Sequence, residues 1–161
     1  MPRTKQPEEL PYPEFRQRIL KSAAARYGFT APDSSTQPWG VIMETGYATG
    51  TFLLFALGNG KASVRFSDGG ASTDGEGSEA IREAAQAMVA LAAEFQPLAT
   101  MVRNFAPPKS GQSVFYLLTT SGVFSVRALD DDLEEHRHAW SPLFYAGHEV
   151  INQYRLLEKG A

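Results

Sequence analysis

The sequence contains no cysteine, which excludes a disulfide framework, thiol catalysis and cysteine-ligated zinc. Long apolar segments are also missing. A helix that crosses a bilayer needs roughly 20 apolar residues in a row, whereas the longest uninterrupted runs here are residues 52–57 and 87–93. Residues 1–10 are charged and lack the apolar core of a secretory signal. We therefore expect a soluble, cytoplasmic protein without a membrane partner.

Positive charge is in short supply too. The chain has 15 Lys and Arg against 18 Asp and Glu, a net charge of −3, and it is acidic from Asp130 onward. Proteins that bind duplexes need clustered positive charge to displace counterions from the phosphates. The basic residues are scattered here, so nucleic-acid binding is disfavoured. Only a small basic patch on the first helix remains open.

What the sequence does contain suits one globular domain. Its 161 residues are 43% hydrophobic and 20% charged, which is enough to form a core without metal or disulfides. Residues 1–12 are polar and rich in proline, and we predict a flexible N-terminal arm there. Residues 13–161 are expected to form a single α+β domain.

The first half of this domain predicts one helix and three strands. Helical spacing of apolar residues begins at Pro13, and Gly28 is a suitable C-terminal cap. Strands are expected at residues 39–46, 52–57 and 61–67. The second is apolar throughout, as a strand covered on both faces would be. The dipeptide Asn59-Gly60 predicts a hairpin with a type I′ turn, because both residues tolerate positive φ.

The second half predicts a long helix, a hairpin and a final helix. Ser78 is expected to cap the long helix, which ends at Pro97, and a second short helix is predicted over residues 98–105. Two strands then follow, at residues 114–119 and 123–127, with a turn at Ser121-Gly122. After an acidic link at residues 130–135, Ser141 and Pro142 suit the N-cap and first position of the last helix.

The expected architecture is a five-stranded antiparallel sheet with helices packed against one face, in the order α-βββ-α-ββ-α. Over residues 13–158 this order, together with size and acidity, resembles the type III secretion chaperone fold, a family of small acidic dimers that bind effector proteins. The resemblance implies a protein-binding dimer but brings no binding residues with it. The Trp39-Gly40 strand and the glycine-rich loop also resemble small bacterial α+β proteins, a likeness that implies no function.

The glycine-rich loop over residues 68–78 is one candidate ligand site. It matches neither dinucleotide nor P-loop patterns and has no lysine for a phosphate. Its oxygen-bearing side chains would suit a hard cation such as Ca²⁺ or Mg²⁺, although not with EF-hand spacing. The candidate ligands are Asp68, Asp74, Glu76 and Ser78. The alternative is a simple surface connection, which the lack of apolar residues favours.

Histidines and serines offer no coherent catalytic set. His136 and His138 are two residues apart in an expected loop, and His148 lies on the flank of the last helix. No GxSxG elbow and no spacing typical of a triad is present. We therefore expect no catalytic residues, no metal and no cofactor. A hydrolase built on His148 and the acidic run at residues 130–132 remains the third hypothesis, in last place.

Surplus aromatic residues favour a protein-binding function. The candidate partner-binding residues are Tyr47, Trp140, Tyr145 and His148. Exposed aromatics commonly anchor protein interfaces, while the alternative is that these rings close the core over the sheet. Our leading hypothesis is a non-enzymatic protein-binding module, such as a chaperone, immunity protein or adaptor, that acts as a homodimer or complex subunit. The competing hypothesis is a small-ligand or divalent-cation-binding domain that uses the glycine-rich loop.

Overall fold

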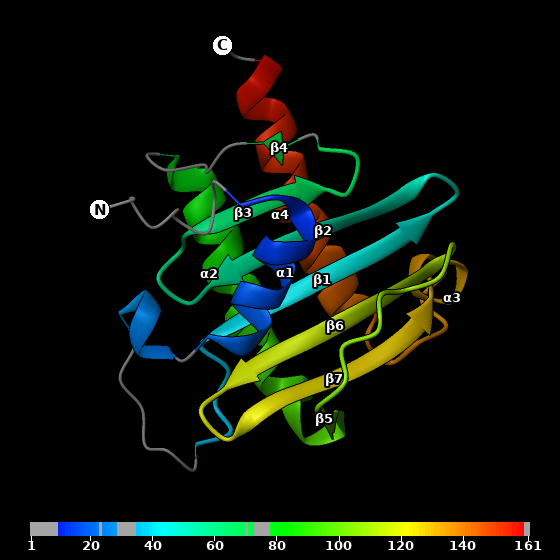
Figure 1. The fold of residues 1–161 in the computed structure, drawn as a ribbon. Helices are drawn as coiled ribbons and strands as arrows, with labels where there is room; N and C mark the ends of the chain where they lie inside the picture. Colours follow the sequence, from blue (N-terminus) through cyan, green and yellow to red (C-terminus); the bar gives the residue numbers. More distant parts are fainter. Residues whose placement is uncertain (1–9, 23, 29–34, 70, 73–77, 160–161) are drawn as a thin grey trace.

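The computed structural model describes residues 10–22, 24–28, 35–69, 71–72 and 78–159, which form an α+β fold around one antiparallel sheet (Figure 1). Its strands are β1 (Gly40–Tyr47), β2 (Gly50–Leu57), β3 (Ala62–Phe66), β4 (Ala71–Ser72), β5 (Thr100–Val102), β6 (Gln112–Thr119) and β7 (Gly122–Leu129). The helices are α1 (Tyr12–Lys21), α2 (Glu79–Phe95), α3 (Asp130–Glu134) and α4 (Ser141–Lys159). Two short 3₁₀ helices, η2 (Ala24–Tyr27) and η3 (Gln96–Leu98), complete the set.

The predicted fold class is confirmed, but the predicted strand number and element order are wrong. The described residues form a seven-stranded sheet in the order β4-β3-β2-β1-β6-β7-β5. The two strands that we did not expect are the short edge strands β4 and β5, which pair with β3 and β7 respectively. Strands of two or three residues are too short for an alternating apolar pattern to be recognised in the sequence. Whether such a segment becomes a strand depends on the neighbouring strand with which it pairs.

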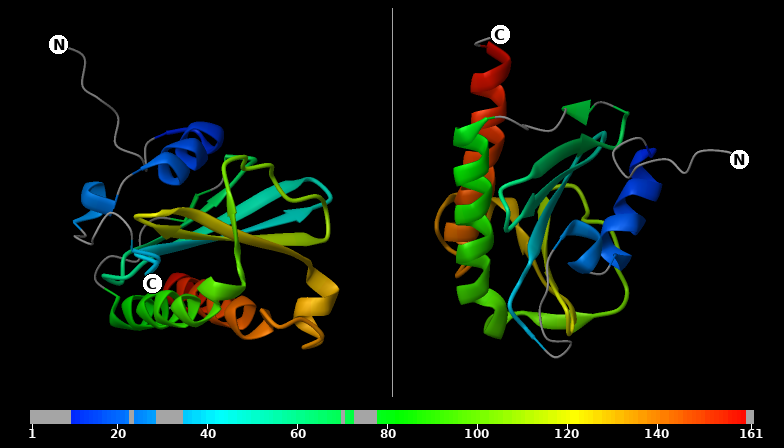
Figure 2. Two further views of the ribbon diagram at one scale, coloured as in Figure 1. Left: turned by 90° about the horizontal axis from the view of Figure 1, so that it is seen from below. Right: turned by 90° about the vertical axis from the view of Figure 1, so that its left-hand side faces the viewer.

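The helices cover both faces of the sheet rather than the single face that we expected. Helices α2 and α4 pack side by side on one face, and α1 lies on the opposite face (Figure 2). The central strands β1, β2 and β6 are therefore buried on both sides. This arrangement agrees with the continuously apolar sequence of β2, which indicated a strand covered on both faces.

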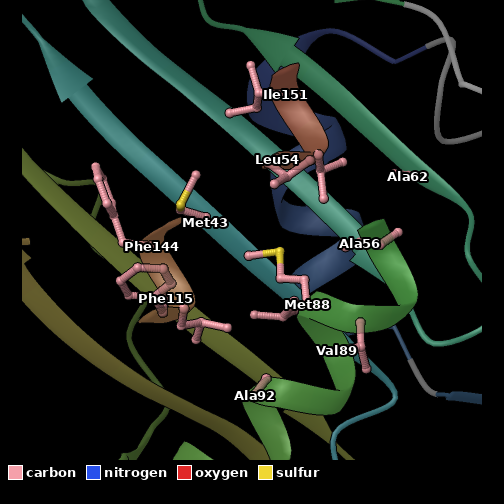
Figure 3. Packing of buried hydrophobic residues seen from close by; sticks show 14 of the residues in the cluster. Met43, Leu54, Ala56, Ala62, Met88, Val89, Ala92, Phe115, Phe144 and Ile151 are labelled. Atoms are coloured by element: carbon pink, nitrogen blue, oxygen red, sulfur yellow. The ribbon is translucent and has the colours of Figure 1, made fainter. Parts of the chain in front are cut away.

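The larger core cluster lies between the sheet and the pair α2 and α4. Met88 of α2 is 0% exposed, as are Met43 of β1 and Phe115 of β6. Figure 3 shows how the side chains of α2, α4 and the strands gather in this cluster. The apolar stripe predicted for α2 supplies much of it, and Ser78 caps the helix by accepting a hydrogen bond from the Ile81 N–H at 3.3 Å, as predicted.

Both predicted hairpins are present, with different turns. Between β2 and β3 the Gly60 N–H donates to Leu57 O at 2.9 Å, and among the described residues of this turn only Gly60 has positive φ. The type I′ turn predicted for Asn59-Gly60 is therefore wrong: the geometry is that of a three-residue loop that ends in a left-handed glycine. Between β6 and β7, Thr119 pairs with Gly122, which places the turn one residue earlier than predicted.

The N-terminal boundaries also differ from the prediction. Helix α1 begins at Tyr12 and ends at Lys21, and Gly28, with φ +85°, follows η2 instead of capping α1. Leu10 and Tyr12 are each 8% exposed, so they belong to the packed fold and not to an arm. The rest of the predicted arm, residues 1–9, lies outside the described residues.

The short helix predicted over residues 98–105 is wrong. Residues 96–98 form η3 and residues 100–102 form β5, because pairing with β7 satisfies the backbone of this segment. The acidic link predicted over residues 130–135 contains the five-residue helix α3. No helix within the described part of the chain is both long and apolar enough to cross a bilayer.

Candidate functional site

A buried polar cluster joins α1 to the sheet. Glu44 of β1 is 0% exposed, and its carboxylate accepts hydrogen bonds from Arg16 Nε at 2.8 Å and from the Tyr12 hydroxyl at 2.6 Å. Arg16 also donates through Nη2 to the Tyr116 hydroxyl at 3.1 Å. The Thr51 hydroxyl in turn donates to Tyr12 at 3.0 Å. Each charge in this cluster thus has a partner of opposite sign or a hydrogen bond.

The electrostatics of this cluster keep both phenols protonated. Burial, followed by the negative charge of Glu44, raises the pKa of Tyr12 above its usual value. Burial also raises the pKa of Tyr116. Both hydroxyls therefore act as donors, Tyr12 to Glu44 and Tyr116 to the Ala106 carbonyl at 3.1 Å. The cluster thus connects α1 to the sheet internally, and the Glu44 carboxylate at its centre is 0% exposed.

Sequence reasoning missed this cluster, although one signal was available. Glu44 follows a run of apolar residues in β1, and an acid at such a position needs a partner if the strand is covered on both faces. The partner, Arg16, is on the buried side of α1 and only 9% exposed. A charged residue on each of two apolar faces is the pattern that would have predicted the pair.

A second polar chain runs from β1 to α3. The Ser113 hydroxyl donates to Asp130 Oδ1 at 2.6 Å, and Thr45 Oγ1 lies 2.6 Å from the same hydroxyl. Because Ser113 has one proton and gives it to Asp130, the Thr45 hydroxyl must be the donor to Ser113. Burial raises the pKa of Asp130, and the Ser113 hydrogen bond opposes that effect. This chain anchors the start of α3, and because Ser113 is 0% exposed its hydroxyl is not accessible to a substrate.

The predicted cation site cannot be assembled from the described residues. Asp68 is exposed, and the Ser78 hydroxyl is engaged with the first turn of α2. Asp74 and Glu76 lie outside the described residues. Within the described ranges, no group of three or more His, Asp or Glu is placed to hold a metal ion.

The three histidines lie in separate environments. His136 stacks on Tyr145, with ring centroids 4.8 Å apart, whereas His138 Nδ1 accepts a hydrogen bond from the Trp140 N–H at 3.1 Å. His148 packs against Phe144 at 4.3 Å, and burial, followed by the charge of Arg155, lowers its pKa. The acidic run at residues 130–132 forms α3, and no hydrogen bond links His148 to it within the described part of the chain. The arrangement thus does not assemble the acid and base that a hydrolase would need.

The predicted partner-binding residues differ in their exposure. Trp140, expected at the margin of the core, is 2% exposed and packs within the core against Phe115, so it cannot present its ring to a partner in this fold. Tyr47 and His148 are half-buried. Tyr145 is 42% exposed, and its hydroxyl donates to the Glu134 carbonyl. Trp140 therefore follows the alternative in which aromatic rings close the core.

Exposed apolar side chains also occur on β7 and α4, at Leu129, Leu156 and Leu157, and two more lie at the border of the sheet formed by β5. Leu98 of η3 is 64% exposed and Met101 of β5 is 47% exposed. Arg103, the first residue after Val102, is also exposed, and it has no ion-pair partner among the described residues. We call Leu98, β5 and Arg103 the β5 edge. Sequence reasoning missed it because residues 98–105 were predicted to be a helix with one buried side.

Met101 has a defined direction on this edge. It pairs with Phe124 of β7, and directly opposed residues in an antiparallel pair point to the same face of a sheet. Phe124 packs against the core cluster on the side of α2 and α4. The side chain of Met101 also lies over Gly122, where an added Cβ would be 3.5 Å from Met101 Cε. Met101 thus extends the apolar face of the sheet to its outer border.

Comparisons with protein-family models, with curated proteins and with solved structures find no match. The resemblance to type III secretion chaperones was based on an element order that the structure does not have, because β4, β5 and α3 are present as well. The function has to be inferred from the geometry of this chain alone.

Proposed function

We propose that this chain is a non-enzymatic protein-binding module that works as a subunit of a protein complex, a class that includes chaperones, immunity proteins and adaptors. The observation that carries the proposal is the pair of exposed apolar side chains on the β5 edge, Leu98 at 64% and Met101 at 47% exposure. Full burial of a side chain of this size stabilises an association by roughly 1.5–3 kcal/mol. Burying both side chains against a partner would therefore stabilise a complex at this edge.

The backbone of β5 supports the same proposal. In the strand order β5 is terminal, so among the described residues only β7 pairs with it. A free sheet edge exposes N–H and C=O groups that can pair with another chain. Proteins usually block such edges with lysine, proline or a charge within the strand. The sequence of β5, Thr-Met-Val, contains none of these and is blunted only by its shortness.

The polar clusters support a binding function over a catalytic one. The Glu44 carboxylate and the Ser113 hydroxyl are both engaged by neighbouring protein groups. Catalysis requires a nucleophile or base within reach of a substrate. Neither cluster supplies a group that is both accessible and activated.

The competing hypothesis, a cation at residues 68–78, makes a different prediction. A cation that binds only the native state must raise its stability. A rise in melting temperature with Ca²⁺ or Mg²⁺, abolished by Asp68→Asn, would favour the cation-binding function. No shift at millimolar concentrations would remove it.

The proposal is tested by affinity capture from a cell lysate with matched surface variants. Leu98→Lys and Met101→Lys place a charge on the β5 edge, and Leu156→Lys is the control because Leu156, 59% exposed on α4, is outside the β5 edge. We expect a protein captured by the wild type and by Leu156→Lys to be lost with both edge variants. Capture that is equal for all four proteins contradicts the proposed function, as does a wild type that neither captures a protein nor associates with itself.

A further inference from the structure

We propose that the β5 edge pairs with the β5 edge of a second copy of this chain, in antiparallel fashion across a twofold axis. This inference rests on the proposed function and deepens it by naming the partner. A twofold interface uses the same patch of both copies, so the patch has to be complementary to itself. Three observations meet that condition: the position of β5, the direction of Met101 and the charges around the edge.

The position of β5 leaves its outer side accessible. It is the last strand of the sheet order and lies at the lower border of the molecule in Figure 1. At β5 the chain passes from the layer of α2 and α4 to the opposite side of the sheet, as Figure 2 shows from below. A second copy that approaches this border therefore meets β5 before any other strand of the sheet.

A symmetric antiparallel register can be written for this segment. If the axis passes beside Met101, then Thr100 lies opposite Val102 of the second copy and the two Met101 side chains are neighbours. Since Met101 points to the same face as Phe124, the two methionines would bury each other on the continuous face of a joined sheet. Leu98, the more exposed of the two apolar residues, lies beside this contact in the chain.

The same register brings opposite charges together. Arg103 falls opposite Ala99 of the second copy, close to where that copy's α2 ends. The last turn of α2 contains no basic residue, and Glu94, which lies in it, is exposed. The C-terminal end of a helix carries partial negative charge, which a cation stabilises. Arg103 of each copy would supply the cation that the α2 of the other copy lacks, and symmetry repeats the interaction twice.

The test is the mass of the protein in solution, measured by size-exclusion chromatography with light scattering over a range of concentrations. We expect the wild type to have twice the mass of the 17.6 kDa chain. Met101→Lys should be monomeric at concentrations where the wild type is a dimer, and Leu156→Lys should behave as the wild type does. A wild type that is monomeric up to millimolar concentration overturns the inference.

A charge exchange locates the interface. Arg103→Glu and Glu94→Arg are each expected to weaken the dimer at least tenfold by placing like charges together, and the double variant should restore it. Both side chains are exposed and outside the core, so at concentrations where all the proteins are monomeric the variants should keep the melting temperature of the wild type. A dimer that neither single variant weakens, or that the double variant does not restore, contradicts the proposed pairing.

The outcomes separate the two proposals. A monomeric wild type whose captured partner is lost in Leu98→Lys refutes the dimer and leaves the protein-binding function standing. A dimer that Leu156→Lys disrupts and Met101→Lys does not would move the interface to α4, against the inference. A monomer that captures no protein refutes both.

Discussion

The guanidinium of Arg16 lies 2.8 Å from the Glu44 carboxylate, although the two residues are 28 positions apart in the chain. Arg16 belongs to α1 and Glu44 to β1, so this pair attaches the helix to the sheet face opposite α2 and α4. The pair is buried, and each member makes a further hydrogen bond, Glu44 with the Tyr12 hydroxyl and Arg16 with the Tyr116 hydroxyl. Because the pair is buried, it fixes the position of α1 on the sheet: a shifted helix would leave a charge in the core without a partner.

Removing either charge alone should therefore destabilise the protein, and the losses from the two substitutions should not add. We expect Glu44→Leu and Arg16→Met each to lower the free energy of unfolding by about 3–5 kcal/mol, since each leaves the other charge buried and unpaired. The double variant should lose less than the sum of the two, with a coupling energy of about 1–3 kcal/mol. Chemical denaturation measures all four proteins. If the losses in the free energy of unfolding of the two single variants add up to that of the double variant, the interaction between the two charges contributes nothing to stability.

Gly46 and Gly147 should respond very differently to the same substitution. A Cβ at Gly46 would lie 2.3 Å from the backbone oxygen of Lys109, in a segment held by the Gly111 N–H bond to Gly46 O at 2.9 Å. For a Cβ at Gly147 the three nearest atoms belong to the flexible ends of Met43 and Met88, at 2.8–3.0 Å. We expect Gly46→Ala to cost about 2 kcal/mol or more, whereas Gly147→Ala should cost less because methionines repack. Thermal unfolding compares them, and equal costs would contradict this account.

His136 is in the left-handed conformation, with φ +59°, because it terminates α3. The Arg137 N–H donates to Asp132 O at 2.8 Å and the His136 N–H to Leu133 O at 3.3 Å, the two bonds of a Schellman motif. Glycine adopts the left-handed conformation at this position without a steric penalty, because it has no Cβ. We expect His136→Gly to be more stable than His136→Ala by about 1 kcal/mol. Both variants lack the ring that stacks on Tyr145, so their difference isolates the backbone, and equal stabilities would contradict the explanation.

His148 should make the stability of the protein fall in mild acid. Burial and Arg155 lower its pKa in the folded state, so the unfolded chain takes up the proton first as the pH falls. The stability that the neutral ring contributes is therefore complete above the unfolded pKa of about 6.5 and is lost as the pH falls through the folded pKa. The ring packs against Phe144, where a charge is poorly solvated.

The measurement is the free energy of unfolding of the wild type and of His148→Phe at several pH values between 7 and 5. We expect the phenylalanine variant to lose less stability than the wild type across this interval, because its ring cannot be protonated. Arg155→Gln should give an intermediate slope, since it removes one cause of the lowered pKa and keeps the histidine. Identical slopes for the three proteins would assign the acid sensitivity to other groups.

Local features of the chain were predicted well because neighbouring residues decide them. The N-cap of α2 at Ser78 and the existence of both hairpins were predicted from local patterns, although the type of the first turn and the exact position of the second were not. The continuously apolar β2 correctly indicated burial on both faces. These features depend on contacts a few residues apart, and the sequence pattern records such contacts directly.

Tertiary structure decided three features: the edge strands, the position of α1 on the sheet and the burial of Trp140. The apolar residues of segment 98–105 have helical spacing, yet residues 100–102 form a strand because their backbone pairs with that of β7. Glu44 and Arg16 are each a charge on an apolar face, but their pairing is formed only when α1 folds over β1. Trp140 follows an acidic segment in the sequence, but its ring packs in the core against Phe115. In each case the energy depends on a partner distant in sequence, and no local pattern specifies which one it is.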